Sequence, residues 1–140
     1  MKLSRSSAYA IQALLRIADN RGRPMTGREL ASELSLPLDY LHKVLRRLVC
    51  AMLLESARGE QGGFRLARQA SHITLFDVVE AIDGHLTADD AELRGRLPES
   101  ATEEIHRSLK LACNQLCSAL QLVSIERLLA VGNGAKTAVG

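Results

Sequence analysis

Residues 57–67, with the sequence ARGEQGGFRLA, restrict the fold of this chain more than any other stretch. A loop of arginine and glycine lies between two short apolar stretches, residues 53–56 and 64–67, and this pattern is typical of a β-hairpin. Arg58 would then lie at the tip of a thin, flexible protrusion. Because a basic segment, residues 39–49, comes just before the hairpin, one surface could present both elements to a nucleic acid.

Three helices are predicted before this hairpin. Residues 6–20 place apolar side chains on one stripe at helical spacing, and a capping box at Thr26 and Glu29 begins a second, short helix. Pro37 breaks that helix, and residues 39–50 form a third one. The side chains left on the outer face of the third helix are Tyr40, His42, Lys43, Arg46 and Arg47. Two short helices joined by a tight turn, the second basic on its free face, are typical of a helix-turn-helix.

The second half of the chain predicts a connector and a long helix. A capping box at Thr74 begins a fourth helix that Gly84 closes, and residues 84–98 have weak periodicity. Another capping box at Ser100 begins the long helix, which we expect residues 132–134 to end. Its apolar side chains recur in steps of four and three, which predicts a seam for a partner helix. The seam residues are Ile105, Leu109, Cys113, Leu116, Leu120 and Val123.

These elements predict a mainly α fold with a small β-hairpin. We expect a winged helix-turn-helix domain at residues 1–84, a connector and dimerisation helix at 85–131, and a disordered tail at 132–140. The net charge is only +2, but residues 40–68 hold six basic and two acidic side chains, whereas residues 83–104 hold two basic and seven acidic ones. This asymmetry suits a polyanion partner at the basic part.

The sequence points to a location and a redox state. It has no run of about 18 apolar residues and no secretory signal, so we expect a cytoplasmic protein that is not bound to a membrane. Its three cysteines are too few, and odd in number, for a secreted disulfide framework, so reduced thiols are expected. We expect Cys50, at the end of an apolar run, in the core.

Four stretches together resemble one known family. They are Met1-Lys2-Leu3-Ser4, Leu38-Asp39-Tyr40-Leu41, Arg58-Gly59 followed by Gly62-Gly63-Phe64-Arg65-Leu66-Ala67-Arg68, and Ile73-Thr74-Leu75-Phe76-Asp77-Val78-Val79. In order and spacing they resemble the Rrf2 family of bacterial regulators, the IscR/NsrR/CymR type. The resemblance implies a homodimeric, DNA-binding transcription regulator, usually a repressor, that combines a winged domain with a long dimerisation helix.

The chain departs from this family in its cysteines. Members with an iron–sulfur cluster place three cysteines in the connector, whereas residues 84–100 contain none here. Cys113 and Cys117 supply at most two thiolates per subunit, so we expect no cofactor and no metal site. His106 lies two turns from Cys113, which disfavours a metal set of these three. The two cysteines are either small apolar residues or, since Cys113 falls on the seam, redox sensors that pair across subunits.

The candidate DNA-binding residues come from the helix-turn-helix and the wing. We expect Tyr40, His42, Lys43 and Arg46 to reach base edges or phosphates in the major groove, and Arg47 to reach a phosphate. Arg58 would enter a narrow minor groove, where a bare glycine backbone allows close approach. The full set is Thr26, Arg28, Tyr40, His42, Lys43, Arg46, Arg47, Arg58, Gly59, Gly62 and Gly63. Alternatively, the basic face is merely solvated and Arg58 is an ordinary hairpin residue.

The sequence thus favours a sequence-specific transcription regulator, a repressor that binds a pseudo-palindromic operator as a homodimer. A small molecule or a protein could serve as its effector. One alternative is a winged-helix module for protein interactions, and another is a thiol-responsive or metal-responsive sensor of the same family. An enzyme is disfavoured, because the sequence has no nucleophile elbow, phosphate-binding glycine loop or paired-carboxylate motif.

Overall fold

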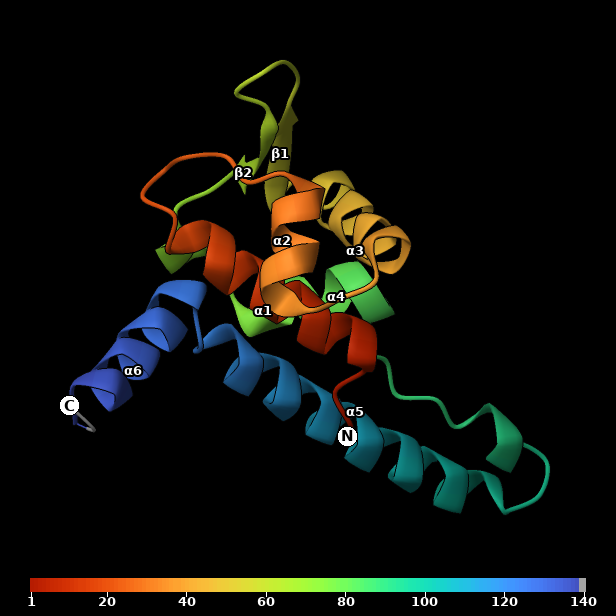
Figure 1. Ribbon diagram of the computed structural model, residues 1–140. Coiled ribbons are helices and arrows are strands. Elements are labelled where there is room, and N and C mark those ends of the chain that lie inside the picture. The colour runs from red at the N-terminus through yellow and green to blue at the C-terminus, as the bar shows by residue number, and fades with distance from the viewer. Residues whose placement is uncertain (139–140) are drawn as a thin grey trace.

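The computed structural model describes residues 1–138, which form a compact head and a long helical arm (Figure 1). The head consists of four α-helices and a hairpin, and the arm runs beneath it (Figure 1). The α-helices of the head are α1 (Arg5–Ala18), α2 (Gly27–Leu34), α3 (Leu38–Cys50) and α4 (Leu75–Asp83). The strands are β1 (Leu54–Ala57) and β2 (Gly63–Leu66), and a short 3₁₀ turn, η1 (Ala70–His72), leads to α4. A second turn, η2 (Ala91–Leu93), lies in the connector, and the arm consists of α5 (Glu99–Gln121) and α6 (Ile125–Ala138).

Side-chain caps mark the starts of α1, α2 and α4, whereas α3 begins after Pro37 without one. Thr26 accepts a hydrogen bond from the backbone N–H of Glu29 at 3.1 Å, and the Glu29 carboxylate accepts one from the Thr26 N–H at 2.8 Å. Thr74 and Asp77 form the same reciprocal pair at the start of α4. The predicted helix-turn-helix is therefore confirmed, and its tight turn passes through Ser35 in the left-handed conformation.

The core of the head is built from the inner faces of these helices. Its largest buried side chains are Leu14, Leu30, Leu41, Leu45, Leu48, Leu53, Leu54, Ile73, Ile125, Val78 and Val79. Leu41, Leu45 and Leu48 come from one stripe of α3, so the opposite face of that helix is left to solvent. Burial thus fixes how α3 is rotated about its own axis.

The hairpin is confirmed, with Glu55 opposite Arg65 and Ala57 opposite Gly63. Its second strand also pairs with the segment before α2, since the Met25 N–H donates to the Phe64 carbonyl at 2.9 Å and the Phe64 N–H donates to the Met25 carbonyl at 2.6 Å. The end of β2 next to the hairpin loop is therefore attached to the residue before the cap of α2.

The single long helix expected for the arm is wrong in three respects. Residues 122–124 divide it into α5 and α6, α5 begins at Glu99 without a side-chain cap, and α6 continues through the glycines of residues 132–134 as far as Ala138. Residues 132–138 of the expected tail are therefore helical, and residues 139–140 lie outside the described part. A glycine inside a helix costs only about 1 kcal/mol relative to alanine. The cost of Gly132 and Gly134 is therefore too small to end α6.

The break between α5 and α6 has a long-range cause. The Leu75 N–H donates to the Val123 carbonyl at 2.9 Å, and the Ile125 N–H donates to the Ile73 carbonyl at 2.8 Å. Ile73 and Ile125 are both completely buried. The corner between the two arm helices is therefore held in the head by backbone pairing and by apolar burial, which a continuous helix would forgo.

Five residues of the predicted seam lie on α5, in which the structure places no buried side chain, whereas the sixth, Val123, lies in the break after this helix. Five seam residues are half-buried, and Leu109 is 38% exposed. Two further leucines, Leu111 and Leu122, are 59% and 75% exposed. Among residues 1–138, no helix combines the length and the apolar character needed to cross a lipid bilayer.

Candidate DNA-binding interface

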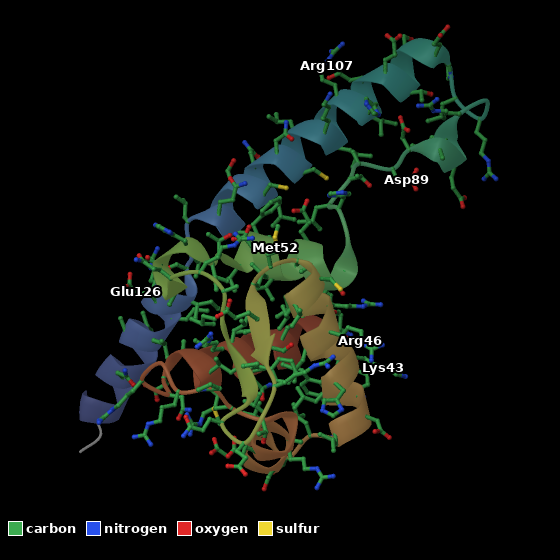
Figure 2. The ribbon with its side chains drawn as sticks, turned by 90° about the horizontal axis from the view of Figure 1, so that it is seen from above. Lys43, Arg46, Met52, Asp89, Arg107 and Glu126 are labelled. Atoms are coloured by element: carbon green, nitrogen blue, oxygen red, sulfur yellow. The ribbon has the colours of Figure 1, made fainter. Side chains whose placement is uncertain are left out.

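The hairpin and α3, which carry the predicted basic contacts, lie beside each other in the head (Figure 1). Figure 2 shows Lys43 and Arg46 extending from α3 into solvent, apart from Asp89 of the connector. Arg58 is exposed on the loop between β1 and β2. These two basic side chains of α3 therefore lie away from Asp89 of the acidic connector.

Four of the predicted DNA contacts are cationic side chains that have no ionic partner in the described part of the chain. Arg28, Lys43, Arg46 and Arg58 are exposed, and none of them makes a hydrogen bond or ion pair among residues 1–138. By contrast, Arg65 donates from Nε to Oε1 of Glu55 across the hairpin at 2.5 Å. The unpaired set is thus the part of the basic surface that is free to bind an anion.

Arg47 differs from its neighbour Arg46. Its Nη1 donates to the backbone carbonyl of Ile82 at 2.5 Å, in the last turn of α4. The predicted phosphate contact of Arg47 stays a prediction, but the guanidinium already has a partner inside the protein. The spacing of basic residues on α3 gave no signal for this bond, because it depends on where α4 packs.

Tyr40 is half-buried and turned toward α1. Its hydroxyl forms a hydrogen bond with the Ser6 hydroxyl, and its ring meets the Tyr9 ring edge-on, with centroids 5.5 Å apart and an interplanar angle of 89°. Such edge-to-face pairs favour a fixed ring orientation. Tyr40 therefore holds the start of α3, which we call the recognition helix, against α1. Sequence reasoning missed this role.

A glycine that was not predicted shapes the helix-turn-helix. A Cβ atom on Gly27 would lie 2.5 Å from Nε2 of His42, so any larger residue would make this imidazole turn away from the first turn of α2. His42 itself is exposed, as are Thr26 and Arg28 at the start of α2. The position of Gly27, directly after the capping threonine, was the available signal.

The wing glycines have different surroundings. A Cβ on Gly63 would lie 2.6 Å from the Met25 carbonyl, and one on Gly62 would lie 2.5 Å from the Ala57 carbonyl. Gly59 has φ +105° but open space around it. Close approach within the protein thus explains Gly62 and Gly63, whereas Gly59 beside Arg58 stays free for an outside partner.

The cysteines do not form a ligand set. Cys50 is exposed, so its expected place in the core is wrong: it lies off the stripe of α3 that ends at Leu48. Cys113 and Cys117 are half-buried free thiols on α5, and Nδ1 of His106 shares a hydrogen bond with Asp90 at 3.0 Å. No group of three or more potential ligands that could hold a metal ion occurs in the described part of the chain. With a connector that lacks cysteine, these residues do not fit an iron–sulfur cluster.

Comparison with known proteins identifies the same architecture. The Rrf2 family model, described as an iron-dependent transcriptional regulator, matches residues 3–131. An HTH-type transcriptional regulator, BadM, from Rhodopseudomonas palustris is 31% identical over 131 residues, which cover 94% of this chain and 83% of BadM. IscR from Vibrio atlanticus is 33% identical over 89 residues, or 63% of this chain and 51% of that protein.

Solved structures agree with this assignment. The cysteine regulator CymR of B. subtilis has a TM-score of 0.74 at 21% identity, covering 94% of this chain and 98% of CymR. IscR of T. potens has a TM-score of 0.69 at 26% identity, covering 96% and 90%. The chain therefore belongs to the Rrf2 family, and it is a DNA-binding transcription regulator with a winged helix-turn-helix head.

Proposed function

We propose that this protein is a homodimeric repressor that binds a pseudo-palindromic operator in the cytoplasm. In this proposal α3 enters the major groove, where Lys43 and Arg46 reach base edges or phosphates, and Arg58 enters the adjacent minor groove. The observation that carries it is the set of unpaired cations on α3, at the start of α2 and at the hairpin tip. Phosphates of duplex DNA would supply the missing counter-charges.

The proposed dimer rests on the arm. None of the 23 residues of α5 is buried, and Leu109 and Leu111 are exposed to solvent. A monomeric protein rarely leaves such an apolar surface uncovered. Pairing of this helix with a second copy would cover the seam residues. It would also set two recognition helices about 34–36 Å apart, or a multiple of that spacing, to match two half-sites.

We further propose that the protein acts by binding alone, with neither an enzymatic activity nor a bound cluster. A thiol-responsive regulator is the second candidate, and the observation that favours it is the pair of free, half-buried thiols on α5, of which Cys113 lies on the predicted seam. Oxidation that links two subunits there would fix the angle between their arms.

Selection of bound genomic fragments by the purified protein, followed by gel-shift titrations at several salt concentrations, tests the main proposal. The protein should prefer one sequence to bulk DNA and lose affinity steeply as salt rises. Arg46→Ala should lower the slope of log affinity against log salt by about one, and Lys110→Ala on the exposed face of α5 serves as the matched control. Equal affinity for all sequences, or unchanged binding by the Arg46 variant, would contradict the proposed interface.

A further inference from the structure

Polar side chains from three helices meet at the last turn of α4. Arg47 of α3 donates to the Ile82 carbonyl at 2.5 Å. The Asp83 carboxylate accepts from the Ser4 hydroxyl at 2.7 Å on Oδ1 and from the Ser7 hydroxyl at 2.8 Å on Oδ2. We call these five residues, Ser4, Ser7, Arg47, Ile82 and Asp83, the α4 junction.

The α1 side of the α4 junction is well suited to a carboxylate. Ser7 is completely buried, and Ser4 is the N-cap of α1, accepting from the Ser7 backbone N–H at 3.0 Å. Asp83 therefore lies at the positive end of the α1 dipole, with both of its oxygens bonded. A residue that appears merely exposed and acidic in sequence thus joins α4 to α1.

A third contact closes the ring between these helices. Tyr40 of α3 bonds to Ser6, which lies in the same first turn of α1 as Ser7. α3 is therefore attached to α1 near its beginning through Tyr40 and to α4 near its end through Arg47. These two attachments lie near opposite ends of α3 and add to the burial of its inner face.

The α4 junction also lies where the chain leaves the head. Gly84 follows Asp83 with φ +86°, and residues 84–98 then lead to the start of α5. The residue that holds α1 is thus the last one before the connector.

We propose that the α4 junction positions the recognition helix for DNA binding, and that Arg47 serves there as a positioning residue instead of a phosphate contact. The inference rests on the proposed interface of α3 with DNA. It assigns to Asp83, an acidic residue, a role that favours the binding of a polyanion.

The sign of one substitution separates this role from simple electrostatics. Replacing an acidic residue by a neutral one should strengthen DNA binding, because it removes repulsion of phosphates. The α4 junction predicts the opposite for Asp83→Asn, since asparagine offers the two serine hydroxyls one acceptor oxygen instead of two and brings no negative charge to the start of α1. We expect about tenfold weaker operator binding, the equivalent of one hydrogen bond to a charged group. Glu92→Gln, an exposed acid on η2, is the matched control and should bind as well as or better than the unchanged protein.

Arg47 is tested by the salt dependence of operator binding. Arg47→Ala should weaken binding while the slope against log salt stays that of the unchanged protein, whereas Arg46→Ala lowers the slope by about one. A slope lowered equally by both variants would assign Arg47 to a phosphate and overturn its positioning role.

A charge-neutral pair guards against misfolding. Ser4→Ala removes the hydrogen bond to Asp83 and should weaken operator binding. Ser4→Thr keeps a hydroxyl at this position and should bind like the unchanged protein. Circular dichroism identifies a temperature at which every variant is folded, and binding is measured there. If Asp83→Asn and Ser4→Ala bind as tightly as the unchanged protein, the α4 junction has no role. If the unchanged protein itself selects no DNA sequence, the proposed function fails instead.

Discussion

Gly63→Ala tests how firmly the wing is attached to the helix-turn-helix. The φ of +137° at this residue strains any side chain, at a cost of about 1–3 kcal/mol. The new Cβ would also lie 2.6 Å from the Met25 carbonyl, so β2 must move away and lose the two backbone hydrogen bonds between Met25 and Phe64. Each of those bonds contributes about 0.5–1.5 kcal/mol, so the free energy of unfolding should fall by about 4 kcal/mol in total.

Gly59→Ala is the matched control, because Gly59 also has a positive φ, +105°, but nothing within 4 Å of the added atom. It should cost only the backbone strain. Urea titrations followed by far-ultraviolet circular dichroism measure both losses, since the chain has no tryptophan to report by fluorescence. Equal losses for the two variants would show that the contact of β2 with Met25 contributes nothing, and would refute the attachment inferred here.

Three further outcomes are expected. Arg58→Ala should weaken operator binding by about 1–3 kcal/mol, and unchanged affinity in a salt-controlled gel-shift titration would remove the wing from the interface. Ile125→Ala should lower the free energy of unfolding by about 2–5 kcal/mol, because it leaves a cavity where the arm enters the head, whereas Leu122→Ala at an exposed site should change it by less than about 0.5 kcal/mol. If Cys113 pairs across subunits, mild peroxide should yield a covalent dimer on non-reducing electrophoresis that Cys113→Ser abolishes, and failure to form it would exclude thiol sensing through this residue.

The head was predictable because its signals are local. The capping boxes at Thr26 and Thr74 and the arginine–glycine loop each occupy a few consecutive residues, and each was found where the pattern placed it. The break before α6 was not found, because it depends on pairing between residues about 50 positions apart, as for Ile73 and Ile125. Ser124, which accepts from the Arg127 N–H at 3.1 Å, was the local N-cap signal that could have revealed it.

The candidate site was predictable in its chemistry but not in its internal contacts. Spacing on a helix shows that Lys43, Arg46 and Arg47 point outward, yet it does not show which of them has a carbonyl within reach. That depends on the packing of α4 against α3, and Arg47 alone of the three meets the end of that helix. The helical spacing therefore predicts which side chains are basic and outward-facing, but not which of them already has a hydrogen-bond partner inside the protein.

The placement of the α5–α6 corner gives small rotations a large effect. At 1.5 Å per residue, the 23 residues of α5 span about 34 Å. If a subunit pivots by about 10° at the far end of α5, the end carrying Ile125 and the head moves by about 6 Å. Successive base pairs are only about 3.4 Å apart, so such a pivot shifts the head by more than one step along the duplex. In the proposed dimer, the length of the arm alone would convert a slight change of crossing angle between the two subunits into the loss of alignment with the second half-site.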